Sequence, residues 1–352
     1  MQYHLFGRSG LRVSELFLGS TTFGEQGGVG APPEECRRIF DAYVDAGGTV
    51  VDTASNYRDG ASEEILGELL VGRRDRMVVA SKYTVSRDRD DPNGGGNHRK
   101  NLRLSLECSL RRLRTDYLDV CWVHVWDRHT PVEETMRALD DEVRAGRVLY
   151  VGISDAPAWI VSRANTLAEW RGWCPFVGLQ VPYSLLQRDV ERDLLPMAEA
   201  YGMAVAAWGP LAGGILSGKY TRPGGPRAHT RIDPTSLSDH QRSVAVEVQA
   251  VADEIGASAS QVAIAWTRAR SPAIHPIVGA RHVDQLIDNL GAIELVLPPD
   301  MMKRLEAAAP FDPGFPTTFI REITPWVFGA ADPPAVTRAR SEDGNGDPRM
   351  NG

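Results

Sequence analysis

The stretch Thr49-Val50-Val51-Asp52-Thr53-Ala54-Ser55-Asn56-Tyr57 places an acid and a phenol directly after a short apolar run. Two later apolar runs end in the same way, because residues 77–80 lead to Lys82 and residues 118–123 lead to His124. Each polar group therefore stands where a buried strand would end. Since the carboxyl ends of parallel strands in a barrel meet on one face, we expect the acid, phenol, amine and imidazole to converge there.

Together these four groups can assist the reduction of a carbonyl. A phenol normally titrates near pH ~10, and an adjacent ammonium lowers that value while a carboxylate holds the ammonium charged. Tyr57 would then serve as general acid, with Lys82 and Asp52 tuning it. His124 would hydrogen-bond the same carbonyl oxygen. None of the four can supply a hydride, so the reaction needs a nicotinamide cofactor.

Each of these residues also has an ordinary structural interpretation. An Asp after a strand can cap a helix, a lone Tyr can be half-buried core, and a single Lys can be a solvated charge. Only their order and spacing favour the catalytic interpretation over these alternatives.

That order and spacing resemble the aldo-keto reductase family, in the branch that includes potassium-channel β subunits and bacterial sugar reductases. The segment 52–57, followed by Ser-Glu-Glu-Ile-Leu-Gly at 62–67, is similar to the family's signature. The resemblance covers most of residues 1–310. Its other blocks are residues 11–14, 18–24, 130–136, 146–154, 180–184, 210–214 and 278–281.

Apolar runs alternate with helical patterns along most of the chain, which predicts a (β/α)₈ barrel (a TIM barrel) in residues 1–330. The expected strands are residues 16–19, 50–51, 77–80, 118–123, 148–153, 176–180, 203–207 and 273–278. The expected helices are residues 32–46, 62–70, 100–113, 130–145, 190–201, 244–255 and 283–290. Residues 3–18 alternate polar and apolar around a turn at 7–10, and the resemblance implies that this hairpin plugs the barrel.

Two other phosphate-binding architectures are disfavoured. An open doubly wound sheet would usually show G-x-G-x-x-G after its first strand, and this pattern occurs nowhere in the sequence. Residues 213–219 match GxxxxGK, but Tyr220 follows where a P-loop needs a hydroxyl for Mg²⁺. Glycines and Lys219 in this segment suit a dinucleotide pyrophosphate instead.

The resemblance implies a set of cofactor contacts, with Trp208 stacking on the nicotinamide and Ser154, Asp155 and Gln180 at its carboxamide. The remaining implied contacts are Gly209, Pro210, Leu211, Gly213, Lys219, Gly279, Arg281, Gln285, Asp288 and Asn289. Arg281 fits a 2′-phosphate, which favours NADPH/NADP⁺ over NADH.

Three of these positions depart from the family's usual residues. Asp155 stands where Asn is usual, and a carboxylate can accept from the carboxamide but cannot donate. Gly209 lacks the usual Ser hydroxyl, and Asp288 is one methylene shorter than the usual Glu.

The substrate is expected to be a small carbonyl compound held by Phe23, Trp126 and Trp208. Aromatic walls with polar neighbours suit a sugar-like carbonyl or a nucleotide-linked keto-sugar, and simple aldehydes remain open. A different class of function is a nicotinamide-binding, redox-sensing regulatory subunit with slow turnover. The four catalytic residues favour an enzyme, although a slow regulator would retain them too.

Composition bounds the cellular setting. The net charge of −7 and pI of about 5.7 argue against nucleic-acid binding. Residues 1–4 show no signal-peptide pattern, and no apolar run approaches the ~20 residues of a membrane span, so we expect a cytoplasmic protein. The cysteines and histidines lack metal-ligand spacing, so no metal is implied. Apolar residues in 311–328 are expected to fold over the barrel mouth, and 331–352 to form a disordered tail.

Overall fold

The computed structural model describes residues 1–28, 30–221 and 232–329, and the predicted tail from residue 331 lies outside them. Eight parallel strands close into a barrel in the order β10-β3-β4-β5-β6-β7-β8-β9, which confirms the predicted (β/α)₈ architecture. The strands are β3 (Phe17–Gly19), β4 (Val50–Asp52), β5 (Val78–Tyr83), β6 (Leu118–Val123), β7 (Val148–Ser154), β8 (Phe176–Pro182), β9 (Ala204–Trp208) and β10 (Ile274–Val278).

The barrel strands are apolar on both faces because both faces are covered. In β6 every residue is buried, and side chains alternate between two cores. Val120 and Trp122 point into the barrel, where they join an inner cluster, whereas Cys121 and Val123 pack in the outer cluster between strands and helices. This alternation fixes which residues at each strand end face the barrel axis.

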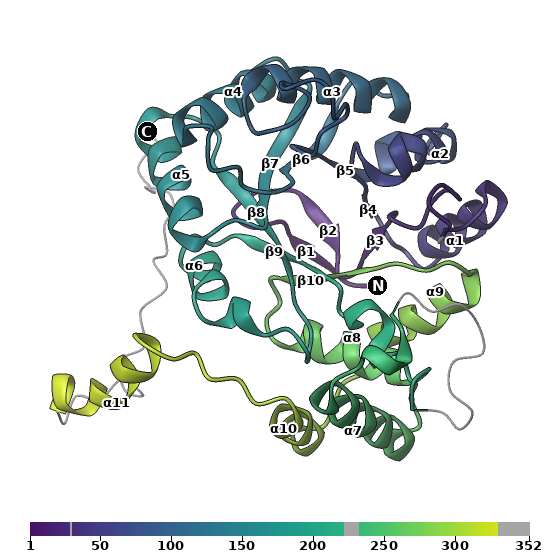
Figure 1. The fold of residues 1–352 in the computed structure, drawn as a ribbon, viewed down its shortest axis with the longest axis vertical. Coiled ribbons are helices and arrows are strands. Elements are labelled where there is room, and N and C mark those ends of the chain that lie inside the picture. Colours follow the sequence, from purple (N-terminus) through teal and green to yellow (C-terminus); the bar gives the residue numbers. More distant parts are fainter. Residues whose placement is uncertain (29, 222–231, 330–352) are drawn as a thin grey trace, which may run out of the picture. The chain divides into compact units, whose positions relative to one another are not determined.

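Helices surround the barrel, as Figure 1 shows. They are α1 (Pro33–Asp45), α2 (Ala61–Leu69), α3 (Arg99–Leu113), α4 (Val132–Arg144), α5 (Ala158–Arg171), α6 (Leu194–Ala200), α7 (Asp239–Ile255), α8 (Ala259–Ala269), α9 (Val283–Leu290) and α10 (Pro299–Ala308). The sequence pattern did not indicate α5, α8 or α10. The helix expected over 190–201 is divided into a short 3₁₀ turn, Asp189–Glu191, and α6.

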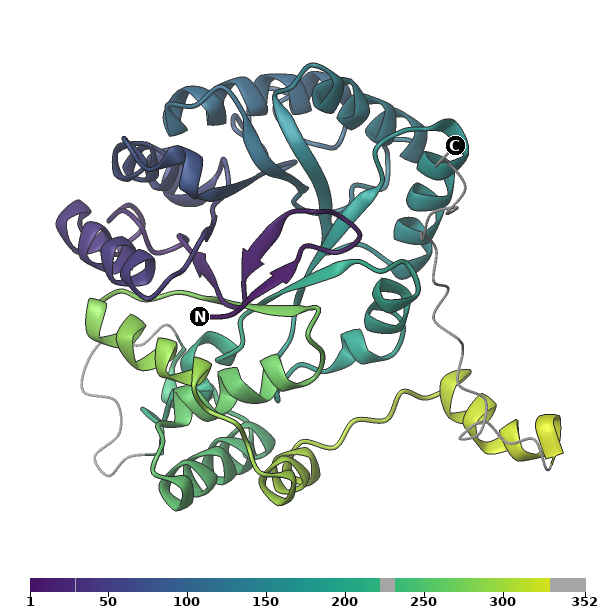
Figure 2. The ribbon, with the colours of Figure 1, turned by 180° about the vertical axis from the view of Figure 1, so that it is seen from behind.

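An N-terminal hairpin closes one end of the barrel. Strands β1 (Tyr3–Leu5) and β2 (Arg12–Ser14) pair antiparallel, and Figure 2 shows them lying across the barrel opening. Phe6, at the end of β1, is buried in the inner cluster, where its ring meets Trp122 edge-on at 6.1 Å. The predicted plug is therefore present, and it leaves the carboxyl ends of the strands as the open face.

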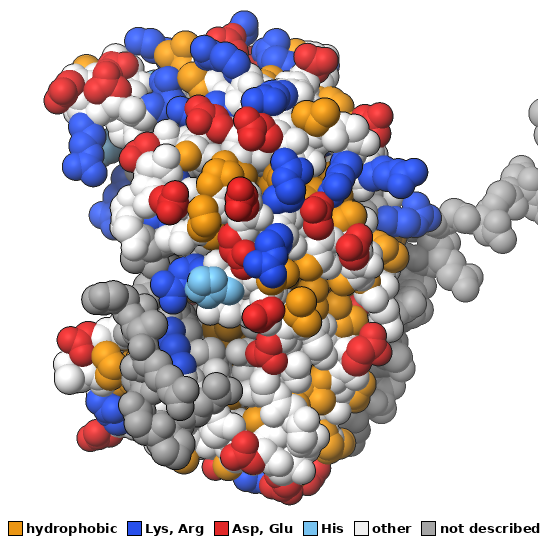
Figure 3. Space-filling model, turned by 90° about the vertical axis from the view of Figure 1, so that its right-hand side faces the viewer, with side chains coloured by type: hydrophobic (Ala, Val, Ile, Leu, Met, Phe, Trp, Pro, Cys, Tyr) orange, Lys and Arg blue, Asp and Glu red, His pale blue; other side chains and the backbone are white. Residues whose placement is uncertain are grey.

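The compact barrel unit spans Met1–Pro310, and residues from Phe311 onward form a second unit. That second unit contains α11 (Thr317–Phe328), whose apolar side chains include the exposed Phe319, Ile320 and Trp326. Whether this segment covers the barrel mouth stays a prediction. Within the described ranges, none of the helices is long and apolar enough to cross a membrane. Acidic and basic side chains are interspersed on the face that Figure 3 shows.

Candidate active site

The four residues predicted to act together do meet at the open face. Asp52 ends β4, Lys82 lies near the end of β5, His124 follows β6, and Tyr57 begins a 3₁₀ turn, Tyr57–Gly60. The Lys82 ammonium donates to Asp52 Oδ2, to the Thr53 carbonyl at 2.7 Å and to Tyr57 Oη at 3.2 Å. One ammonium therefore links the acid and the phenol.

Lys82 and Asp52 form a buried ion pair, in which Lys82 is 2% exposed and Asp52 is 3% exposed. Burial alone would lower the pKa of Lys82, but the Asp52 carboxylate and the Tyr57 phenol more than offset it and raise that pKa. Lys82 thus stays an ammonium across the neutral range. A charged donor in so dry a site polarises the phenol oxygen more strongly than it would in water.

Gln180 holds the second oxygen of Asp52. Its Nε2 donates to Asp52 Oδ1 at 3.0 Å, across 128 residues of sequence. The resemblance implied only a cofactor contact for Gln180. Because its nitrogen is committed to Asp52, its amide oxygen is the atom that can accept from a ligand.

His124 lies beside Tyr57, with ring centroids 5.9 Å apart and planes at 77°. Burial, assisted by the charge of Lys82, lowers the pKa of His124 to about 3, so its imidazole is neutral at physiological pH. Its Nδ1 is buried without a hydrogen-bond partner. A neutral imidazole can donate one hydrogen bond to a substrate oxygen without placing a second cation beside Lys82.

A residue with a strained backbone, Thr84, contacts the backbone of His124. Thr84 has a φ of 105°, which is rare for a β-branched side chain. In this conformation its hydroxyl accepts from the His124 backbone N–H at 3.2 Å and donates to Asn97 Oδ1 at 2.7 Å. Such strain commonly accompanies functional sites.

A partly buried ion pair braces the loop that carries Tyr57. The Arg112 guanidinium donates to the Ser55 carbonyl at 3.0 Å and to Glu63 at 3.3 Å. Glu63 in turn accepts from the Ser81 hydroxyl, next to Lys82, at 2.6 Å. These contacts hold the loop in a fixed position relative to strand β5. The sequence motif contained Glu63, but no local signal pointed to Arg112.

The residues implied for the carboxamide lie together at the ends of β7, β8 and β9. The Ser154 hydroxyl is buried, makes no well-formed hydrogen bond and lies close to the Asp155 carboxylate. Trp208 is 40% exposed, and its Nε1 donates to Asp155 Oδ1 at 3.3 Å. Although Asp155 is exposed as a residue, its carboxylate is partly desolvated, which raises its pKa. An unsatisfied hydroxyl and an open aromatic face are what a flat polar ring requires.

The glycine segment after β9 has the backbone of a phosphate cradle. Gly209, Gly213 and Gly214 all adopt positive φ, and a Cβ on Gly214 would strike the Lys219 amine. Pro210 and Leu211 lead into a 3₁₀ turn, Ala212–Ser217. Glycines therefore let Lys219 and the backbone come close together, which suits a pyrophosphate.

At the predicted adenosine end, several residues make contacts within the protein. Gln285 accepts from the Arg281 N–H at 3.0 Å, and buried Asn289 donates to the Gly279 carbonyl at 3.5 Å. Asp288 accepts from Ser258 at 3.0 Å and from Gln261 at 3.3 Å. Ser258 and Gln261 were not indicated by the sequence pattern. An adenine contact by Asp288 would have to share its oxygens with these two donors.

The predicted substrate residues differ in their surroundings. Trp126 is partly buried, and its backbone N–H donates to the Asp155 carbonyl at 3.4 Å, so the loop after β6 lies next to Asp155. Phe23 has no exposed surface and packs in the outer cluster. The structure therefore does not give Phe23 the open face that a pocket wall needs.

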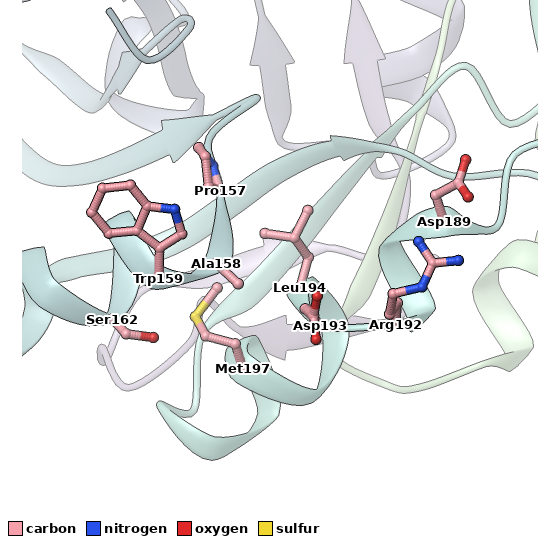
Figure 4. Close-up of a pocket in the computed structure, with 9 residues that line it drawn as sticks. All are labelled: Pro157, Ala158, Trp159, Ser162, Asp189, Arg192, Asp193, Leu194 and Met197. Carbon is pink, nitrogen blue, oxygen red and sulfur yellow. The ribbon is translucent and has the colours of Figure 1, made fainter. Parts of the chain in front are cut away.

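A separate groove of about 590 Å³ lies between the start of α5 and the segment leading into α6. Figure 4 shows the Trp159 indole on one side of it and the Arg192 guanidinium near Asp189 on the other. None of the predicted site residues lines this groove.

Comparison with known proteins gives a consistent family match. The model described as the aldo/keto reductase family matches residues 15–310. A putative aryl-alcohol dehydrogenase of Saccharomyces cerevisiae is 35% identical, covering 95% of this chain and 90% of its own length. The aryl-alcohol dehydrogenase [NADP(+)] of Phanerodontia chrysosporium is 38% identical, covering 87% and 85%. A norsolorinic acid reductase of Aspergillus flavus is 37% identical, covering 91% and 84%.

Proposed function

The chain belongs to the aldo/keto reductase family, and we propose that it interconverts an aryl carbonyl compound and its alcohol with NADPH/NADP⁺ as hydride carrier. The observation that carries this proposal is the hydrogen bond from the buried Lys82 ammonium to Tyr57 Oη, with the neutral His124 ring alongside.

These residues can perform the proton half of the reaction. Tyr57 would give its hydroxyl proton to the carbonyl oxygen as that oxygen gains negative charge. Lys82 stabilises the phenolate that remains. Its hydrogen bonds to Asp52 and to the Thr53 carbonyl fix the direction in which the ammonium points. His124 donates a hydrogen bond to the same oxygen and so orients the carbonyl. When bound, the nicotinamide supplies the hydride.

The chain's residues fit such a cofactor. Ser154 offers a buried hydroxyl that makes no well-formed hydrogen bond, Trp208 offers an open aromatic face, and Lys219 lies against a glycine cradle. The preference for NADPH is supported by Arg281, since a guanidinium matches phosphate geometry, and by a relative whose name specifies NADP(+).

Two observations favour an aryl substrate over the sugar-like carbonyl expected from sequence. Relatives that align with most of the chain are named aryl-alcohol dehydrogenases. Trp208, whose Nε1 donates to Asp155, has an exposed aromatic face that suits a flat ring, and Trp126 lies in the neighbouring loop. All four cysteines are unpaired, which fits a reducing cytoplasm.

The direct test is turnover of purified protein on a panel of aryl aldehydes, aryl ketones and keto-sugars, with NADPH and NADH in parallel. We expect faster NADPH oxidation with aryl aldehydes or ketones than with keto-sugars. Tight NADPH binding without turnover of any carbonyl would favour the redox-sensing regulatory subunit instead. Failure to bind either cofactor would refute both functions.

A further inference from the structure

Asp155 places a second carboxylate at the open face, near the catalytic ion pair. It follows β7 directly in a left-handed conformation, with a φ of 46°. Its N–H donates to the Gln180 carbonyl at 3.2 Å, and its Oδ1 accepts from Trp208. The backbone of Asp155 is therefore held against the end of β8 and its carboxylate contacts the end of β9, although the residue as a whole is exposed.

The proposed function places the nicotinamide beside this carboxylate. A hydride donor has to lie within about 3–3.5 Å of the carbonyl carbon whose oxygen Tyr57 protonates. Trp208 supplies the open aromatic face at this end of the barrel, while Ser154 and the Gln180 oxygen are the polar atoms available to a carboxamide. A ring stacked on that face would have the Asp155 carboxylate nearby, because Asp155 accepts from the Nε1 of Trp208.

The catalytic group carries no net charge of its own. Asp52 and Lys82 cancel as an ion pair, and His124 is neutral because burial lowers its pKa. Burial raises the pKa of Asp155, and the charge of Lys82 is among the smaller effects that lower it, so the two groups lie within electrostatic range of each other. Behind them Glu63 and Arg112 also cancel. Asp155, like Asp127 in the loop after β6, thus has no ion-pair partner among the described contacts.

We propose that Asp155 makes the site discriminate between the redox states of the cofactor, favouring the oxidised, cationic nicotinamide over the neutral reduced one. This inference rests on the proposed function. The two forms differ by one positive charge on the ring, and an adjacent carboxylate attracts that charge through a partly desolvated site. A hydrogen bond from the carboxamide to Asp155 would be present in both forms, so it would cancel in the ratio of the two affinities.

Asp155→Asn isolates the charge from the geometry. Asn tolerates positive φ, and its amide oxygen can still accept from Trp208. The matched control is Asp116→Asn, which removes one exposed carboxylate just before β6, at the opposite end of the barrel. Calorimetric titration of each protein with NADP⁺ and with NADPH gives the ratio of the two Kd values without requiring turnover.

We expect the ratio Kd(NADP⁺)/Kd(NADPH) to rise about three- to tenfold in Asp155→Asn and to stay constant in Asp116→Asn. An unchanged ratio in Asp155→Asn, or equal weakening of both cofactors, would overturn the inference while leaving the proposed function intact. Wild-type protein that binds neither cofactor would refute the proposed function itself, and this inference with it.

Discussion

Lys82 and Tyr57 are joined by a 3.2 Å hydrogen bond in which a buried ammonium donates to the phenol oxygen. Lys82 has no freedom to leave this position, because it also donates to Asp52 and to the Thr53 carbonyl. The Tyr57 hydroxyl is therefore positioned by three elements: the end of β4, the loop that follows it, and β5.

The ion pair should matter for both stability and turnover. In Lys82→Met the Asp52 carboxylate stays buried and keeps only its bond from Gln180, so we expect a loss of about 3–5 kcal/mol in the free energy of unfolding. We also expect kcat to fall about 10²–10⁴-fold. Urea unfolding and steady-state kinetics measure the two effects, with the exposed Lys303→Met as control.

A double variant separates the two roles. Removing both charges in Asp52→Asn/Lys82→Met should recover most of the stability, because a buried pair often contributes little net free energy. It should not recover kcat. Recovery of turnover in the double variant would show that the ammonium is not needed at Tyr57.

The ion pair behind the Tyr57 loop should act on turnover through position alone. Arg112→Met removes the cation beside the unexposed Glu63, which keeps only neutral donors such as Ser81 and Ser109, and frees the Ser55 carbonyl. We expect a loss of about 3 kcal/mol in stability and a lower kcat, with the Kd for NADPH within about twofold of wild type. Arg111→Met, the exposed neighbour on α3, is the control. A destabilised Arg112→Met with unchanged kcat would limit this pair to a structural role.

His124 should remain neutral through the whole working range. Its pKa is lowered to about 3 by burial and by the charge of Lys82. In NMR spectra the His124 ring signals should therefore stay constant from pH 8 to pH 5, whereas in Lys82→Met its pKa should rise. A midpoint near the ordinary value of about 6.5 in wild type would contradict the neutral-donor role.

His275 gives the fold a pH dependence that is independent of catalysis. Its ring is unexposed, stacks on Phe17 at 4.9 Å, and has neither nitrogen hydrogen-bonded in the described structure. Burial first, then the nearby His4, lowers its pKa to about 4. Between about pH 6.5 and 4 the unfolded chain binds a proton that the folded chain does not, so stability is lost as pH falls.

The size of this effect follows from the shift. Relative to His275→Phe, which keeps a ring but cannot titrate, wild type should lose about 3 kcal/mol of unfolding free energy between pH 7 and pH 4. Groups that titrate in both proteins cancel in this difference. Parallel stability curves for the two proteins would show that His275 accepts a proton within the fold.

The barrel and its catalytic centre were largely predictable from local sequence. Each barrel strand is an apolar run in the sequence. Asp52, Lys82 and His124 each lie at or next to the carboxyl end of such a run. Because the strands are parallel, these three residues come to the same face of the barrel. The N-terminal hairpin was predictable for a similar reason, because its alternation and its turn are both local signals.

Contacts made across the barrel were not predictable in this way. The bond between Gln180 and Asp52 joins residues 128 positions apart, and nothing near either residue announces it. The burial of Phe23 depends on its packing in the outer cluster, which gathers residues from distant parts of the chain. Helix α5 was missed because exposed Trp159 and Trp170 blur the contrast between its apolar and polar faces.

The measurement that tests the central claim most directly is single-turnover reduction of an aryl aldehyde by NADPH-loaded Tyr57→Phe. The substitution removes one hydroxyl and keeps the ring that packs edge-on against His124. With Tyr57 as the proton donor, the rate constant for hydride transfer falls about 10²–10⁴-fold while the Kd for NADPH is unchanged. Hydride transfer at the wild-type rate in this variant would contradict the account, because the proton would then come from another group.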